Sequence, residues 1–334
     1  MVLSPGLIGG RAPGLRDPRC KIGSSPRVRE RDSVTPIGHH RGMDGTWDPV
    51  PPATVPARLR PYVASMAGYA AHGLRPGTHR GLPSTELTLI LPIDAPLRWA
   101  EDAAAWAGGG AVSQWWVLGG LHTRPAVVGQ DGSWAGIQIG LRPLGARALL
   151  GSPSAALPTG PWEPDGRLGG AVARVAERLA AAPTWPARYA VARGFLVELL
   201  DLHDTTGPAP RPEVAEAGRQ RTAPGQAPTV AEVADRVGYS RRRLTQLVTD
   251  EVGHGPKTVA RLARFTYARR LLVAGAVTGR LEVAAAAAGA GYYDQSHLVR
   301  DFHDFVGLPP SRWWAEEFPN LQAAAVADPA ASTP

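Results

Sequence analysis

Apolar and polar positions partly alternate in short segments between residues 57 and 142, which is the pattern of half-buried β-strands. The segments rich in aromatic or β-branched residues are Tyr62–Ala70, Thr85–Leu91, Val112–Leu118, Ala126–Val128 and Trp134–Ile139. Turn-forming residues separate them, among them Arg75-Pro76-Gly77, and Asp131-Gly132 predicts a tight hairpin between the last two segments. We therefore expect an antiparallel sheet or half-barrel in this part of the chain.

Beyond Gly140 the apolar positions recur with the period of a helix. Two segments, Leu168–Ala182 and Pro186–His203, have this character, and Tyr189, Ala192 and Leu196 in the second follow one another at spacings of three and four. Together with the strands, these helices predict an α+β domain over residues 57–203.

The flanking segments lack such periods. Residues 1–56 contain nine prolines and predict a disordered, basic, Pro/Gly-rich arm. Met43 is, by hypothesis, the biological start, with residues 1–42 translated from upstream sequence. Residues 204–228 predict a linker that holds a first helix of the next domain at 212–223, and residues 319–334 predict a disordered tail.

Residues 229–318 contain two copies of one pattern. Val233-Ala234-x-x-Val237-Gly238-Tyr239 matches Ala286-Ala287-x-x-Ala290-Gly291-Tyr292 at an offset of 53 residues. At an offset of 54, Leu244, Val248, Val252-Gly253 and Pro256 match Leu298, Phe302, Val306-Gly307 and Pro310. One extra residue near Tyr293 accounts for the change, and everything after it stays in register.

Each copy predicts a helix-turn-helix. In the first copy, Thr229 and Glu232 are expected to form a capping box at the start of the first helix. Gly238 is suited to the positive φ that a sharp turn between helices demands. Ser240 is expected to cap the second helix, and Asp294 takes its place in the second copy.

The segment between the copies, residues 256–274, predicts a single connecting helix that begins at a proline. Such a helix completes an all-α domain and holds the two units rigidly apart. The second helices of both units are then expected to enter successive major-groove segments on one face of DNA, ~34 Å apart.

The second unit reads Gly-Tyr-x-Asp-Gln-Ser-His-Leu-x-Arg-x-Phe, followed by Val-Gly-x-x-Pro. With the first unit and the connecting helix, it resembles the DNA-binding domain of AraC/XylS-type transcriptional regulators over residues 211–318. The segments 120–125 and 143–147 resemble the sensor half of actinobacterial members of that family. The resemblance implies a sequence-specific DNA-binding regulator, activator or repressor, whose domain 57–203 senses an unknown effector or dimerises.

By the family's pattern, exposed positions of each second helix read bases. These are Arg241, Arg242, Thr245 and Gln246 in the first unit and Gln295, Ser296, Val299 and Arg300 in the second. The residue types suit this task, because Arg binds guanine, Gln binds adenine and a Val methyl contacts the thymine methyl. Phosphate contacts are expected near the helix N-termini that follow Pro256 and Pro310, from Lys257, Thr258, Arg261, Ser311 and Arg312.

Two features depart from the pattern. Asp301 stands where the first unit has the apolar Leu247. The first helix of the second unit, with alanine at every position from 284 to 288, is expected to have a thin core.

Charge and chemistry narrow the function further. The net charge is +7, but residues 1–45 hold eight Lys or Arg against four Asp or Glu, so bulk charge says little about the folded domains. Cys20 is the only cysteine, which excludes a disulfide framework and a cysteine-cluster zinc site. Motifs for phosphate loops, dinucleotides, hydrolytic serines and metal-binding histidines are lacking, so we expect no cofactor, no metal and no catalytic residue.

The expected protein is thus not an enzyme. The alternative is an enzyme, of hydrolase or DNA-repair alkyltransferase type, that carries this DNA-binding module. The candidates to line an effector pocket are Trp99, Trp115, Trp116 and Trp134. The alternative is that these side chains belong to the core and rim of the sheet.

The expected partners are double-stranded promoter DNA, a small-molecule effector, a second copy of the chain in a homodimer and, for an activator, RNA polymerase. No run approaches 18 consecutive apolar residues, so we expect no membrane partner and a cytoplasmic location.

Overall fold

The structure is a computed structural model that describes residues 46–48, 50–161, 163–164, 166–203, 229–277 and 280–316. These residues all belong to one compact unit, His39–Pro334. Residues 1–45 of the expected arm, with Met43, the expected linker 204–228 with its helix, and the expected tail 319–334 lie outside the described residues. We call residues 46–203 the sheet region and residues 229–316 the helical region.

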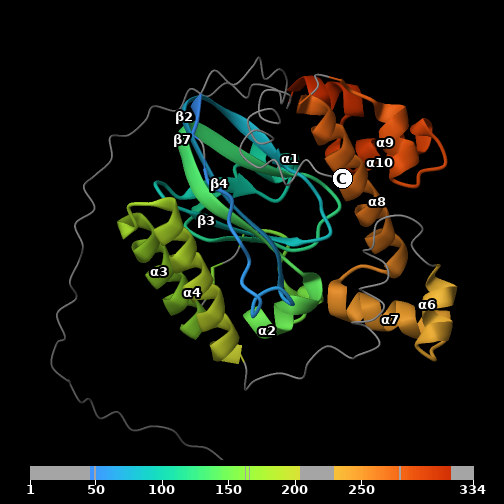
Figure 1. Cartoon of the computed structure of the whole chain (residues 1–334), viewed down its shortest axis with the longest axis horizontal. Coiled ribbons are helices and arrows are strands. Elements are labelled where there is room, and N and C mark those ends of the chain that lie inside the picture. The colour runs from blue at the N-terminus through green and yellow to red at the C-terminus, as the bar shows by residue number, and fades with distance from the viewer. Residues whose placement is uncertain are drawn as a thin grey trace, which may run out of the picture. The chain divides into compact units, whose positions relative to one another are not determined.

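Seven strands form one antiparallel sheet in the described part of the sheet region. They are β1 (Thr46–Trp47), β2 (Val63–Gly81), β3 (Leu87–Pro92), β4 (Leu97–Ala100), β5 (Val112–Gln114), β6 (Val117–Gly119) and β7 (Ala126–Leu141). The order is β1-β2-β7-β3-β6, and β4 pairs with both β5 and β7. The long strands β2 and β7 form the centre of this sheet (Figure 1). The expected antiparallel sheet is confirmed.

The predicted hairpin at Asp131-Gly132 is wrong, because β7 runs through these residues as one strand and pairs with β2 along its length. β2 likewise continues through the expected turn Arg75-Pro76-Gly77. The two irregular segments lie opposite each other, with Leu74 paired to Gly132 and Gly77 paired to Gln130. Between the pairs Ala71–Trp134 and Gly77–Gln130, β2 advances six residues whereas β7 advances four, so β2 bulges there and the ladder continues instead of ending.

The segment Val112–Leu118, expected as one strand, is divided at Trp115 and Trp116 into β5 and β6. The reason is a change of partner, because β5 pairs with β4 whereas β6 pairs with β3. A strand that serves two neighbours in turn leaves the ladder between them, and this places the two tryptophans at the break.

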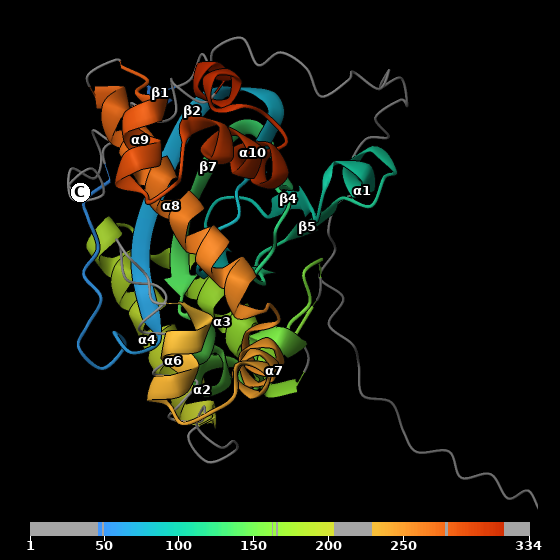
Figure 2. The same ribbon diagram turned by 90° about the vertical axis from the view of Figure 1, so that its right-hand side faces the viewer.

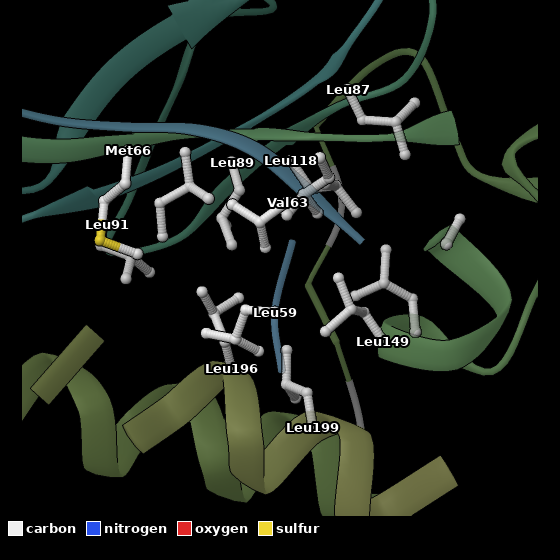
Figure 3. Close-up of a cluster of buried hydrophobic side chains, with 14 of the residues drawn as sticks. Leu59, Val63, Met66, Leu87, Leu89, Leu91, Leu118, Leu149, Leu196 and Leu199 are labelled. Carbon is white, nitrogen blue, oxygen red and sulfur yellow. The ribbon is translucent and has the colours of Figure 1, made fainter. Parts of the chain in front are cut away.

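Helices cover one face of the sheet. They are α2 (Ala146–Leu150), α3 (Gly166–Ala181) and α4 (Trp185–His203), of which α3 and α4 correspond to the predicted helices, and a short α1 (Ala103–Ala107) follows β4. Leucines of β3, with Leu118 of β6, point toward Leu196 and Leu199 of α4 and Leu149 of α2 (Figure 3). The apolar period of α4 therefore faces the core as expected.

The chain before β2 also packs on this region. Val50 is buried, and the hydroxyl of Tyr189 in α4 donates to the carbonyl oxygen of Pro51 at 2.8 Å. The same hydroxyl accepts a hydrogen bond from the backbone N–H of Gly68 at 2.9 Å. Residues 50–51 of the expected arm are thus held by α4 and β2.

No helix within the described ranges is long and apolar enough to span a membrane.

Five helices form the helical region between residues 229 and 306. They are α6 (Val230–Arg236), α7 (Arg241–Val252), α8 (Pro256–Val277), α9 (Val283–Gly289) and α10 (Gln295–Val306). The pairs α6–α7 and α9–α10 lie at opposite ends of α8 in both views (Figures 1 and 2). The two predicted helix-turn-helix units and the single connecting helix are confirmed.

The two inter-helix turns have the same geometry. Gly238 has φ of +72° and Gly291 has φ of +74°, which is the left-handed region that disfavours other residues. Directly after the glycine, the N–H of Tyr239 donates to the carbonyl oxygen of Ala234 at 2.9 Å, and the N–H of Tyr292 donates to that of Ala287 at 3.0 Å. The duplicated sequence therefore forms a duplicated turn.

The substitution Gly238→Ala tests the turn. A Cβ atom there meets no atom within 4 Å, so its cost comes from the backbone alone. We expect a loss of about 1 kcal/mol in the free energy of unfolding of the full chain in urea, and a smaller loss for Gly238→Asn, because Asn tolerates positive φ.

The matched control is Gly194→Ala inside α4, where the new Cβ makes only an ordinary contact and φ is not positive. This variant is expected to be as stable as the wild type or slightly more stable. Equal stability of Gly238→Ala and the wild type would contradict the turn geometry.

Candidate nucleic-acid interface

The helices of the first unit begin with side-chain caps. Thr229 Oγ1 accepts from the N–H of Glu232 at 3.2 Å, and Glu232 Oε2 accepts from the N–H of Thr229 at 2.7 Å, which completes the predicted capping box. The hydrogen bond from the Thr229 backbone lowers the pKa of Glu232. Ser240 then caps α7 by accepting from the N–H of Arg243 at 3.2 Å.

The second unit repeats the cap of the second helix with a carboxylate. Asp294 Oδ1 accepts from the N–H of His297 at 2.7 Å. The two second helices also end alike, at the left-handed glycines Gly253 and Gly307. α7 and α10 therefore start and stop at equivalent residues, and both contain 12 residues.

Each second helix buries one face and exposes the other. In α7, Leu244, Leu247, Val248 and Val252 are buried, and in α10, Leu298, Phe302, Phe305 and Val306 are buried. Of the predicted base-reading residues, those that are exposed are Arg241, Arg242, Thr245, Gln246, Gln295, Ser296 and Arg300, while Val299 is half-buried. The structure thus brings the predicted residues of each unit onto one solvent-facing surface.

Two of the residues expected to contact phosphates, Lys257 and Arg312, lie near the starts of helical segments. Lys257 is exposed at the second position of α8, and Arg312 is exposed in the last described turn. Arg312 also donates to Glu316 at 3.2 Å, and Gln246 donates to Asp250 at 2.7 Å, so each has a partner on its own helix.

Helix α8 sets the distance between the units. It contains 22 residues, which corresponds to about 33 Å at the rise of an α-helix. This length is close to one turn of B-DNA.

Aromatic residues fill the second unit where its first helix is thin. Only Ala286 and Ala287 of α9 are buried within the run of alanines. Phe265 of α8 packs against Phe302 and Phe305 of α10 with ring centroids 5.1 and 5.0 Å apart. Large side chains on α8 and α10 therefore occupy the space that alanine leaves in α9.

A buried ion pair explains Asp301. Its carboxylate is 2% exposed and accepts from Arg261 of α8 through Nε at 3.0 Å and Nη2 at 2.6 Å. The hydroxyl of Tyr292 donates to the other oxygen of Asp301 at 3.1 Å. These bonds fix α10 on the connecting helix, whereas Leu247, at the equivalent position of the first unit, belongs to an apolar core.

Arg261, expected to contact phosphate, is thus held by carboxylates of α10. Arg261 also donates to Asp304 at 2.6 Å, and its hydrogen bond to Asp301 raises its pKa. Burial and the neighbouring Asp301 raise the pKa of Tyr292. We did not predict this network from the sequence. The signal for it was Asp301, a carboxylate at an apolar position of the repeat, which indicates a buried cationic partner.

The last turn of α7 contacts the sheet region. Glu251 is 8% exposed, and both of its carboxylate oxygens accept from Nε of Arg147 in α2, at 2.8 and 2.9 Å. Apolar residues of α6 and α7 belong to the same buried cluster as the core of the sheet region, whereas α9 and α10 have a cluster of their own. The first unit is thus packed against the sheet region through its buried face.

The four candidate tryptophans are not all brought together. Trp115 and Trp116 line one groove beside α3. Trp99 is buried next to them and donates to Gln114 Oε1 at 2.8 Å. Trp134 is not among the residues that line this groove; it packs against the buried cluster that contains Trp99, and its ring lies 5.1 Å from that of Tyr69 and 5.8 Å from that of His79.

The Asp301 network gives a stability prediction. Asp301→Ala leaves the charge of Arg261 and the hydroxyl of Tyr292 without their buried acceptor, so we expect a loss of roughly 3 kcal/mol in urea unfolding. Asp304→Ala is the matched control, because it removes the exposed carboxylate from the same arginine and is expected to cost less than about 1 kcal/mol.

The double substitution Arg261→Met with Asp301→Leu removes both charges and is expected to recover most of the loss. Similar losses for Asp301→Ala and Asp304→Ala would show that the buried pair does not hold α10.

Comparisons with known proteins place the helical region in a family. A family model described as "Helix-turn-helix domain", of AraC type, matches residues 233–316. No curated protein matches the sequence. Solved structures similar to the chain include those of ToxT from Vibrio cholerae.

One ToxT structure, of strain O395, has 11% identity and a TM-score of 0.44, covering 77% of this chain and 97% of that one. A second, of apo ToxT K231A from strain SCE256, has 10% identity and a TM-score of 0.46, covering 75% and 97%. With the duplicated turns, caps and exposed helices, the family match makes residues 233–316 an AraC-type helix-turn-helix domain and the chain a DNA-binding regulator of transcription.

Proposed function

We propose that α7 and α10 read bases in two successive major-groove segments on one face of promoter DNA. The observation that carries this proposal is the duplication itself, in which two capped helices with equivalent ends expose polar faces at the two ends of one helix. A single such unit is also found in helical hairpins that bind nothing, whereas two units in register suit the repeat of the double helix.

The chemistry of the exposed side chains supports roles for them. Arg242 and Arg300 suit guanine, Gln246 and Gln295 suit adenine, and Val299 suits the methyl group of thymine. Arg241, Thr245 and Ser296 extend the same surfaces with further hydrogen-bonding groups. The half-buried position of Val299 is compatible with contact to a methyl group that projects into the groove.

Lys257 and Arg312 are proposed to hold phosphates. Both are exposed cations in the first turn of a helical segment, where backbone N–H groups also favour an anion. Such contacts set the register of the protein on DNA without reading its sequence.

We further propose that residues 57–203 form a domain that senses a small-molecule effector or dimerises, and that residues 229–318 bind DNA. The chain acts by binding and not by catalysis, in the cytoplasm, with RNA polymerase as a partner if it activates. A ligand changes DNA binding only if it prefers one arrangement of the protein over another.

Single substitutions in the exposed faces test the assignment. Arg242→Ala and Arg300→Ala are each expected to weaken binding to the specific site by about 1–3 kcal/mol and to relax base choice at one position. The measurement is a binding isotherm of the full chain with two kinds of DNA. One is a genomic fragment recovered by its binding to the protein, and the other is random DNA of the same length.

Arg243→Ala is the matched control. Arg243 is exposed in the same turn as Arg242 but lies about 100° around the helix from it. Its loss is expected to weaken specific and random binding alike and by less. If Arg242→Ala and Arg300→Ala weaken binding equally on specific and random DNA, they contact phosphates and the base-reading assignment is wrong.

A further inference from the structure

A groove of about 480 Å³ opens on the sheet region between β5, the residues that follow it and helix α3. This volume falls in the range of small-molecule sites. Trp115 and Trp116, at the break between β5 and β6, line one side, and α3 lines the other.

The two walls leave room for a flat apolar body. On α3 the lining includes Gly169, Ala173, Ala176 and Ala180, whose small side chains keep that wall open. Trp115 is 43% exposed, so its ring is available to stack. Trp116 is buried and packs edge-to-face on Phe195, which gives the groove a rigid apolar wall.

The charged side chains described along the groove are all negative. Of the described residues that line it, only Glu163 and Glu177 are charged, and none is Lys, Arg or His. Neither carboxylate has an ion-pair partner within 4.0 Å among the residues that the structure describes. The site therefore presents uncompensated negative charge next to an exposed indole ring.

A chain of hydrogen bonds orients one of the carboxylates. The Trp99 indole N–H, which only donates, requires that Gln114 turn its Oε1 toward it at 2.8 Å. The Nε2 of Gln114 must then point the other way, where it donates to Glu163 Oε1 at 2.7 Å. Gln114 is itself buried, so Glu163 is held by the core of the sheet region.

We propose that this groove binds an organic cation with a flat apolar body, such as an aromatic amine or quaternary ammonium compound. The apolar body lies between Trp115 and the small residues of α3, and the cationic group lies near Glu163 and Glu177, with the indole ring adding cation–π attraction. The inference rests on the proposed effector-sensing role of residues 57–203 and names the class of ligand. It assigns Trp99 a positioning role through Gln114.

Two probes with the same naphthylmethyl body and opposite charge test the proposal on the full chain. We expect (naphthalen-2-ylmethyl)trimethylammonium to bind in isothermal titration calorimetry and naphthalen-2-ylacetate not to bind under the same conditions. Glu163→Gln and Glu177→Gln are each expected to weaken binding of the cation by at least about fivefold, because each removes one negative charge. Glu101→Gln, an exposed carboxylate outside the groove, is the matched control and is expected to leave binding unchanged.

Trp115→Ala is expected to weaken binding of the cation roughly 2- to 30-fold, and Trp115→Phe to weaken it less. Because Trp115 is exposed, far-UV circular dichroism is expected to show that the variant remains folded. Binding of the anion as tight as that of the cation, or binding indifferent to Glu163 and Trp115, would overturn the proposal.

DNA binding measured without either probe separates the two claims. A chain that retards its DNA site but binds no cation refutes this inference alone. A chain that binds the cation but no DNA refutes the proposed function instead.

Discussion

The direction of the second helix in each helix-turn-helix unit is set by one left-handed glycine, and the exposure of that helix depends on the turn. At Gly238 and Gly291 the backbone takes a conformation that closes the angle between two helices within a few residues. The small alanine four positions earlier supplies its carbonyl oxygen to the residue after the glycine, which locks the turn. With this turn in place, α7 and α10 expose their polar faces and pack their apolar faces into a core.

The two units meet this constraint with different packing. The first unit shares its buried cluster with the sheet region and places Glu251 against Arg147. The second has a separate cluster, rich in aromatic rings, and fixes its helix to α8 through Asp301 and Arg261. A change in the sheet region therefore has a direct physical route to α7, and the second unit has contacts of its own with that region through Arg80–Glu316 and Leu82.

Local sequence determined the helical region well. Caps, turn glycines and the connecting helix depend on residues close in the sequence, and the duplication supplied an internal check on each of them. The exposed positions of α7 and α10 were implied by the resemblance to the AraC/XylS family. The Arg261–Asp301 pair did not, because its members are 40 positions apart and meet only when α8 packs on α10.

The sheet was less predictable because its pairings are long-range. Asp131-Gly132 and Arg75-Pro76-Gly77 are good turn formers, yet they face each other across β2 and β7, where β2 bulges and the ladder continues. The groove beside α3 likewise brings Trp115 together with Glu163 and residues of α3, which lie about 50 or more positions later in the chain. No local pattern in the sequence could therefore predict it. Of the four tryptophans suggested by composition, two line this groove, and the nearby Trp99 acts through Gln114.

The central claim is that two equivalent helices meet adjacent turns of one duplex on the same face. Hydroxyl-radical footprinting of the full chain on its DNA site tests this most directly. The account predicts two protected segments per bound chain, centred about 10 base pairs apart on one face of the helix. A single protected segment, or two segments offset by half a helical turn, would contradict it.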